Sequence, residues 1–587
     1  MEVYPLYDGN DFCLSAILEA CFRASLDTDQ QRCAATLARS LLEHDTTIRQ
    51  LANYLSETGI GAQCAVIERE YLDRNFSDDY SAYYGGCFRD CHRRCCRVHF
   101  FKECYEAGDI ERNLVASEED GSLKKFKASY LGFVVIRPLM QTIIGRTCLV
   151  PYPCEKSYDA AGRHYLAVCT NDVSFFGVRL VVKCMPFQEQ DCGTSACATC
   201  ALWSTFCVSA RMFGNKCPSP STITALAMDN SFSIGTRFPN RGLTAEEMVY
   251  AIRRNGLEPV NVCLKGYEKS EVDYLFSGFI YAYLNLGVSV IAIIDDKDGQ
   301  GKHAIAINGY NLKKDSGEAL SAMRIDKYYA NDDQCCPGAR FQPDWNGDIL
   351  EIKAYRGPSF AQVLHKTYYL ERLIVPLYHK IRVAFTEIAQ LVLESNGILF
   401  FTDLCVRRCN RDLLLSICNN DEFIKEHLGY CFNKDDVVDA VPNYGKICFE
   451  DGDTLKEFTK ELRKKYDEYR LKEGGMVGKI IQWDITLKAS NDIKDEVRVD
   501  TRIPEGKRVS FLEQHLPRYV WCVRISYGGQ SSSIVFIDAT DSVRGLYVVG
   551  ALFYNVEVQD IARYAYANDK RVATNPLIKA LCAYLES

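Results

Sequence analysis

The chain has 587 residues, of which 47% are hydrophobic and 25% charged, and its formal net charge is −8. One hydrophobic core does not support this length, since a typical domain has about 150 residues, so we expect two to four domains. The acidic balance argues against binding to nucleic-acid phosphates or an anionic membrane. The N-terminus has no signal-peptide pattern and no run is long and apolar enough to cross a membrane, which predicts a cytoplasmic protein.

The first 128 residues predict a mainly helical, cysteine-rich region. Apolar residues recur at helical spacing in four segments, residues 12–24, 31–43, 46–57 and 62–73. A polar stretch at residues 118–125 predicts a loop at the end of this region.

Cysteine is unusually frequent, with 28 residues in the chain. Without a secretion signal, most of these thiols are expected to be reduced and buried. Cys87, Cys91 and Cys95 recur every four residues and would share one face of a helix, and Cys104 follows them. Structural zinc sites typically take ligands from separate elements. We therefore expect a helix with a cysteine-lined face, no metal and no cofactor, although zinc binding between Cys87 and Cys104 stays an alternative.

The central third predicts helices first and a sheet later. Strand patterns at residues 131–136 and 175–182 precede an apolar helix at about 194–210. The capping box formed by Thr244 and Glu247 then starts a second helix. The remaining expected elements are a strand at 259–262, a helix at 270–287, and strands at 288–294, 303–309 and 323–330.

The last third predicts a mixed region of helices and strands. Helices are expected at residues 375–394 and 454–472, and strands at 479–487, 518–527 and 533–538. The expected division is therefore a helical region at 1–128, a central domain at 129–345 and a mixed region at 346–587, in an α+β protein.

Four residues of the central third form a candidate cysteine nucleophile site. Cys197 lies near the start of the apolar helix, whose positive end favours thiolate over thiol. Gln190 precedes it by seven residues and could donate to an oxyanion. His303 begins the strand-like run HAIAINGY, and Asp332 follows the next expected strand, where an acid could orient the imidazole.

This set resembles the papain-like cysteine peptidases. It looks closest to the bacterial branch related to double-glycine-leader, or bacteriocin-processing, peptidases, because a His-Ala-hydrophobic run ending in Gly-Tyr is common in that superfamily. The resemblance covers roughly residues 130 to 345. It implies a nucleophile helix packed on an antiparallel sheet, and a Cys–His–Asp triad of Cys197, His303 and Asp332 with Gln190 in the oxyanion hole.

The identity of the nucleophile is where the chain departs from this family. Leader peptidases carry their cysteine in an Asp-Cys-Gly motif, which Cys192 matches literally. The family places its glutamine six residues before the cysteine, but that position relative to Cys192 is Pro186. Gln190 lies seven residues before Cys197, one more than the usual spacing, which favours Cys197 as the nucleophile. Cys200, one helical turn further on, is more typical of packing.

The resemblance implies an intracellular thiol hydrolase that cleaves peptide or isopeptide bonds in a peptide or protein substrate. Acyl transfer of the transglutaminase type would use the same triad. A catalytically inactive shell that binds a protein, and a zinc-stabilised binding protein built on the Cys87–Cys104 cluster, are the alternatives from other classes. The flanking regions are expected to choose the substrate, to regulate the site or to contact a protein partner.

Overall fold

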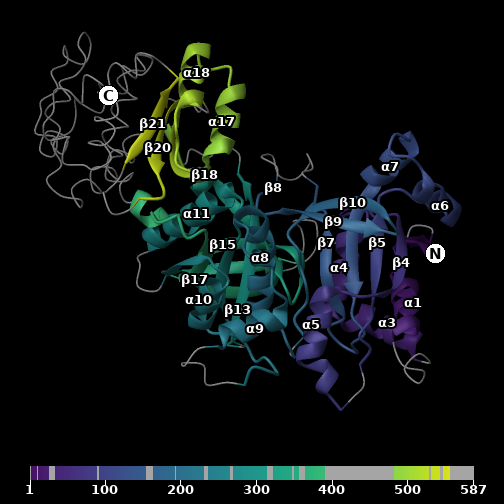
Figure 1. The fold of residues 1–587 in the computed structure, drawn as a ribbon. Coiled ribbons are helices and arrows are strands. Elements are labelled where there is room, and N and C mark those ends of the chain that lie inside the picture. Colours follow the sequence, from purple (N-terminus) through teal and green to yellow (C-terminus); the bar gives the residue numbers. More distant parts are fainter. Residues whose placement is uncertain are drawn as a thin grey trace, which may run out of the picture. The chain divides into compact units, whose positions relative to one another are not determined.

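The computed structural model describes most of the chain, and it divides the chain into two compact units (Figure 1). Unit 1 comprises Met1–Phe276, Gly287–Lys314 and Ile325–His379, and unit 2 comprises Ser277–Leu286, Asp315–Arg324 and Lys380–Ser587. The described residues are 2–8, 11–12, 14–25, 33–88, 91–153, 163–191, 193–229, 236–264, 269–299, 301–313, 321–346, 349–355, 364–389, 481–527, 530–541 and 547–554.

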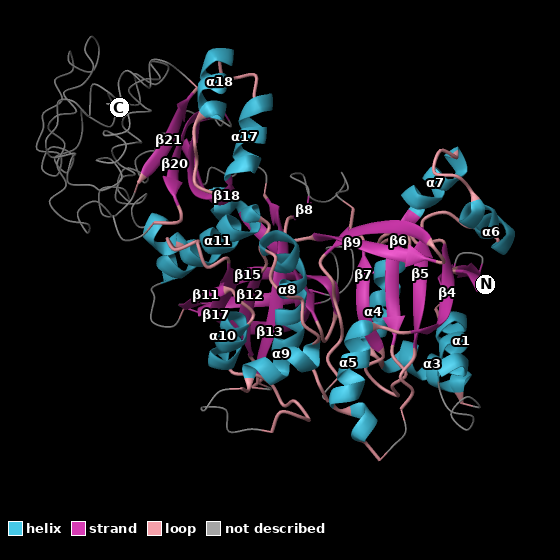
Figure 2. Ribbon diagram, in the orientation of Figure 1, coloured by secondary structure: helices cyan, strands magenta, loops and turns pink. Residues whose placement is uncertain are grey.

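Unit 1 begins with a five-stranded antiparallel sheet (Figure 2). Its strand order is β1 (Glu2–Pro5), β4 (Cys64–Tyr71), β5 (Cys95–Phe101), β6 (Tyr130–Ile136) and β7 (Ile144–Leu149). One face packs on helices α1 (Ser15–Ser25), α3 (Ala34–His44) and α4 (Thr46–Leu55). The other face packs on the hairpin of β9 (Cys169–Phe175) and β10 (Val178–Cys184), and on α6 (Ala107–Val115) and α7 (Gly121–Ser129).

Three of the four helices expected in the N-terminal region are confirmed as α1, α3 and α4, but the fourth, expected at residues 62–73, is wrong. Residues 62–73 hold strand β4, and the apolar run at its start is buried on both faces. Such a strand lacks the alternation of a half-exposed one, so its sequence resembles a buried helix. The cysteine-lined helix is also wrong, because Cys87 follows the 3-10 helix η1 (Tyr84–Gly86) and Cys95 begins β5.

The second part of unit 1 is a larger antiparallel sheet covered by helix α8 (Cys197–Phe213). The strand order is β11 (Glu258–Cys263), β17 (Leu364–Leu377), β12 (Val290–Asp296), β13 (Lys302–Leu312), β14 (Ile325–Asp332), β15 (Cys336–Asn346) and β16 (Ile349–Tyr355). Strand β16 also pairs with β17, so six of these strands close on themselves. The short strand β8 (Arg163–Tyr165) pairs with β13.

Several elements expected in this part are confirmed. The capping box of Thr244 and Glu247 starts helix α10 (Ala245–Arg254), after α9 (Pro220–Ala227). The strands expected at 259–262, 288–294, 303–309 and 323–330 correspond to β11, β12, β13 and β14, and the helix expected at 270–287 corresponds to α11 (Lys269–Leu286).

Unit 2 contains a four-stranded antiparallel sheet, β18 (Ile481–Ala489), β19 (Tyr519–Tyr527), β20 (Gln530–Asp538) and β21 (Val548–Phe553). Helices α17 (Ser490–Val499) and α18 (Glu505–Glu513) pack on it through one apolar core. The three strands expected here are confirmed. The helix expected at 375–394 is wrong in its first residues, which belong to β17, and the helix expected at 454–472 lies outside the described residues.

The described chain is thus a mixed protein of helices and antiparallel sheets, as an α+β fold requires. The three-domain division stays a prediction, although strand pairing crosses both of its boundaries. In the described part of the chain, no helix combines the length and the apolar character that a membrane span needs. The cytoplasmic location stays a prediction.

Candidate active site

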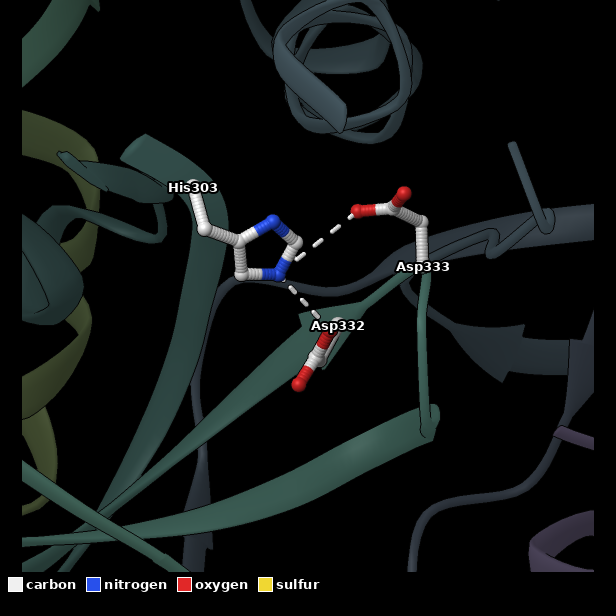
Figure 3. A group of neighbouring side chains, drawn as sticks. All are labelled: His303, Asp332 and Asp333. Atoms are coloured by element: carbon white, nitrogen blue, oxygen red, sulfur yellow. Dashed lines mark hydrogen bonds and ion pairs between the residues drawn. The ribbon is translucent and has the colours of Figure 1, made fainter. Parts of the chain in front are cut away.

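His303 and Asp332 meet because their strands are antiparallel neighbours. His303 is the second residue of β13, and Asp332 is the last residue of β14. Because the two strands are antiparallel, both residues lie at the same end of the strands. The Nε2 atom of His303 is 2.8 Å from Oδ1 of Asp332, and both side chains are buried, with exposed fractions of 5% and 1% (Figure 3). A buried carboxylate at this distance fixes the ring orientation and stabilises the imidazolium.

Cys197 is the first residue of helix α8, which packs directly on β13. Its side chain is half-buried, whereas most cysteines of unit 1 that the structure describes are buried. Burial alone would lower the pKa of His303, but the charge of Asp332, its hydrogen bond to the ring and the neighbouring Cys197 thiol raise this pKa well above its ordinary value. The ring therefore favours the protonated form that a thiolate partner requires.

Nδ1 of His303, the ring nitrogen that does not bond to Asp332, is the one that can interact with Cys197. Nδ1 is buried and has no hydrogen-bond partner in the part of the chain that the structure describes. It points away from Asp332 in Figure 3. Hydrogen bonds at a catalytic site without substrate are often long and tighten when substrate binds. The arrangement can hold a proton between a thiol and a buried imidazole.

A loop before helix α8 fixes the position of Cys197. In this pre-helix loop, defined here by Asp191 and residues 193–196, the Oδ1 atom of Asp191 accepts hydrogen bonds from three backbone N–H groups. They belong to Gly193 (3.0 Å), Thr194 (2.8 Å) and Ser195 (2.8 Å). Burial would raise the pKa of Asp191, but Arg137 and these hydrogen bonds lower it, so the carboxylate stays charged. The helix consequently begins at Cys197, three residues later than the expected start at 194.

The N-terminal part of unit 1 forms a wall beside this loop. A Cβ atom on Gly193 would lie 2.9 Å from the ring of Tyr83 and 3.0 Å from the hydroxyl of Tyr84. Burial, and after it the negative charge of Asp191, raise the pKa of Tyr84. The backbone approaches these rings so closely that only glycine fits without movement.

Gln190 is half-buried and lies between two anchored neighbours. The Oε2 atom of Glu189 accepts a hydrogen bond from the backbone of Ile144 at 3.0 Å, and Asp191 is held as described. The nearby Gln188 is buried, and its Nε2 lies 3.9 Å from Sγ of Cys200. Among the described hydrogen bonds none joins Gln190 to Cys197, so its place in an oxyanion hole stays a prediction.

The other cysteine candidates differ from Cys197 in their surroundings. Burial, followed by the charges of Asp333 and Asp191, raises the pKa of the Cys200 thiol well above its ordinary value, which makes Cys200 a poor nucleophile. Cys192 lies outside the described residues.

One group in the described part of the chain has the composition and spacing of a metal site. Ligand atoms of His303, Asp332 and Asp333 lie within 4.8 Å of one another, whereas the Cys87–Cys104 cluster forms no such group there. Within this group, Nε2 of His303 is hydrogen-bonded to Asp332 at 2.8 Å.

Two supporting residues were missed in the sequence. From the sequence, Asp191 has no assigned role beyond the Asp-Cys-Gly motif, and Arg137, which directly follows the strand expected at 131–136, has none. An aspartate six residues before the first residue of a helix, with Gly, Thr and Ser among the residues between, is a signal for an Asx-type turn and could have identified Asp191. No comparable signal identifies Arg137, whose role depends on chain segments that meet only in the fold.

Comparison with models of known protein families finds no match for the chain, and the search of curated proteins finds no significant match either.

Proposed function

We propose that this protein is a thiol hydrolase that cleaves peptide or isopeptide bonds with Cys197, His303 and Asp332. The observation that carries the proposal is the buried position of His303, which is hydrogen-bonded to Asp332 through Nε2 and lies near enough to Cys197, the first residue of a helix, for the thiol to raise its pKa. The helix end, the imidazolium and the half-buried thiol are the conditions that lower the free energy of a thiolate.

The reaction follows from these positions. The Cys197 thiolate attacks the substrate carbonyl carbon, and the Cys197 backbone N–H together with the Gln190 amide receives the negative charge on oxygen. His303 gives its Nδ1 proton to the leaving amine, which departs and leaves a thioester on Cys197. His303 then takes a proton from water as the resulting hydroxide attacks the thioester, and the Cys197 thiolate leaves as the carboxylic acid is released, which restores the starting pair of thiolate and protonated His303.

The wider fold supports a papain-like core. A papain-like enzyme places its nucleophile at the start of a buried helix that packs on an antiparallel sheet. Helix α8 is buried along most of its length and packs on β12, β13 and β14. In this proposal the N-terminal sheet is an essential part of the enzyme, because its residues hold the pre-helix loop through Asp191.

The test is cleavage of a peptide library made from whole-cell protein, read by mass spectrometry as new N-termini. The protein should produce a reproducible set of termini. Cys197→Ala should produce none, His303→Ala should lose at least about a hundredfold of the rate, and Cys200→Ala should retain most of it because that thiol is only packed. Cleavage that survives both Cys197→Ala and His303→Ala would overturn the proposal.

Two further conditions separate the alternatives in the same experiment. An added primary amine that is incorporated at the new C-termini would identify acyl transfer rather than hydrolysis. Activity that a chelator abolishes and added zinc restores would reassign His303, Asp332 and Asp333 to a metal. A folded protein with no cleavage in any condition would favour the inactive shell.

A further inference from the structure

His303 faces a second buried carboxyl group besides Asp332. The Oδ1 atom of Asp333 lies 3.9 Å from Nε2 of His303, the nitrogen that Asp332 also faces at 2.8 Å (Figure 3). That separation is too long for a hydrogen bond but short enough for strong attraction between opposite charges in a buried setting. One imidazole is therefore shared by two acids on successive residues.

In the described part of the chain, the burial of Asp333 is offset only by the charge of His303 and by a hydrogen bond from the backbone of Asp333 itself. Its side chain is 3% exposed, and its Oδ2 atom has no hydrogen-bond partner in the described part of the chain. A charged carboxylate without compensating hydrogen bonds is costly to bury. Burial therefore raises the pKa of Asp333 to about 7, against the opposing charge of His303 and with a further contribution from Asp332. The acid ionises in the range where a cysteine hydrolase works.

Other elements surround this group with few competing charges. The ring of Tyr368 on β17 stacks near His303, with 6.2 Å between ring centroids. Asp296 at the end of β12 lies close enough to His303 to feel its charge, but pairs with Lys366 at 2.6 Å. Helix α8 contributes the thiols of Cys197, which faces His303, and Cys200, whose pKa Asp333 helps to raise. Among the charged groups described around His303, Asp333 is thus the second carboxylate set directly against the ring.

We propose that Asp333 is a second positioning acid, an inference that rests on the proposed function. As Asp333 ionises, its negative charge holds the proton on His303 and so preserves the ion pair with Cys197. Asp332 orients the imidazole through a hydrogen bond, whereas Asp333 acts through charge alone. Because the pKa of His303 is raised well above its ordinary value and that of Asp333 is about 7, a rise in pH ionises Asp333 before it deprotonates His303. His303 therefore retains the proton that the leaving amine needs up to a higher pH than it would with Asp332 alone.

The test measures the titration of His303 directly. The imidazole C2 hydrogen exchanges with deuterium at a rate that follows loss of the ring proton, and peptide mass spectrometry reads this exchange for one histidine at a time. In Asp333→Asn the midpoint for His303 should fall by about one pH unit or more, as expected when an opposite charge within about 4–6 Å is removed. Asn is nearly the same size as a protonated aspartate, so the variant should fold, and Asp333→Ala provides a second variant.

The control is Asp326→Asn, at the other end of strand β14, where the carboxyl accepts a hydrogen bond from Asn311. This change should leave the His303 midpoint unmoved. An Asp333→Asn midpoint equal to that of the unchanged protein would overturn the inference. The proposed function fails separately, if Cys197 in the unchanged protein reacts with an alkylating agent no faster than the buried thiols.

A second signature distinguishes charge from structure. Below about pH 6 Asp333 is protonated, given its pKa of about 7. Cys197 should therefore be alkylated as fast in Asp333→Asn as in the unchanged protein. Asp332→Asn removes the orienting hydrogen bond and should slow alkylation at every pH. Equal slowing by both variants at pH 6 would show that Asp333 only packs.

Discussion

Arg137 and Asp191 form a buried ion pair, with 3.6 Å between Nη1 and Oδ2 and exposed fractions of 3% and 0%. Arg137 follows strand β6 of the N-terminal sheet, and Asp191 holds the backbone that leads into Cys197. Arg137 also donates hydrogen bonds to the backbone carbonyls of Thr142 and Glu189. The first sheet of unit 1 is therefore connected to the candidate nucleophile by charge and by hydrogen bonds.

Asp191→Ala should be strongly destabilising, because it leaves the Arg137 charge buried without its partner and removes the acceptor of three backbone N–H groups. Breaking a buried pair in this way costs about 3–5 kcal/mol. Urea unfolding followed by fluorescence measures the loss. The control is Asp172→Ala, at an exposed pair with Arg179, where a change within about 0.5 kcal/mol is expected. A loss at Asp191 as small as that at Asp172 would contradict the account.

Stability should fall as pH rises from about 4.5 to 7, in part because of Glu189. Burial raises the pKa of Glu189 from its ordinary 4.5 to about 7 despite the opposing charge of Arg137. Across that window the folded chain keeps a proton that the unfolded chain releases, so the stabilising contribution present below pH 4.5 disappears by about pH 7. Glu189→Gln, which keeps the acceptor for the Ile144 N–H, should reduce this dependence by an amount on the order of 1–3 kcal/mol.

The check is the urea midpoint of the unchanged protein and of Glu189→Gln at pH 5 and at pH 7.5. Glu43→Gln, at an exposed carboxyl, serves as the control. An identical fall in the midpoint for Glu189→Gln and the unchanged protein would show that Glu189 ionises normally.

Gly193→Ala should displace the loop before helix α8, because the new Cβ would lie 2.9 Å from the ring of Tyr83. A shift of about 1 Å at a catalytic group can cost about a hundredfold in rate, so the alkylation rate of Cys197 should fall between tenfold and that limit. Adding Tyr83→Ala should recover part of the rate. Gly86→Ala, where a Cβ meets no atom within 4 Å, is the matched control. Full reactivity in Gly193→Ala would refute the steric argument.

Gln190→Ala should lower turnover by about 10²–10³ if the amide receives the oxyanion. The alkylation rate of Cys197 should stay unchanged, since alkylation forms no oxyanion. Gln188→Ala is the comparison, because that amide lies against Cys200 and should affect stability more than turnover. The opposite order, with Gln188→Ala the more damaging to turnover, would transfer the oxyanion role to Gln188.

Much of the part of unit 1 that holds the candidate site was predictable, because its elements have strong local signals. The capping box of Thr244 and Glu247, the glycines that end helices and the apolar runs of the strands correctly predict the helices and strands of this part. Antiparallel pairing of the successive strands β13 and β14 then brings Asp332 to His303. In the N-terminal region, helices α1, α3 and α4 were predicted, but strands β4 and β5 were not, because these strands are buried on both faces. Strand β5, CCRVHFF, is buried throughout and has no period of two to separate it from a helix.

The supporting network was not predictable in the same way. The pair of Arg137 with Asp191 joins a strand end to a loop through tertiary packing, and neither residue type is unusual at its place in the sequence. Asp333 could be seen beside Asp332, but its distance from His303 depends on how β14 ends and turns. Local patterns identify elements and their order, whereas buried charge networks emerge only when those elements are packed.

The central claim is that Cys197 is a nucleophile that His303 activates, and limiting iodoacetamide at pH 6 tests it most directly. An ordinary thiol is almost wholly protonated there, since its pKa is about 8.5. Background labelling is expected at Cys217, whose pKa is lowered by a hydrogen bond from Cys207, 2.7 Å away, and by nearby arginines. Peptide mass spectrometry should find Cys197 labelled fastest, and His303→Ala should abolish that preference while leaving Cys217 unchanged. Labelling of Cys197 at the rate of the buried thiols, or a preference that survives His303→Ala, would contradict the account.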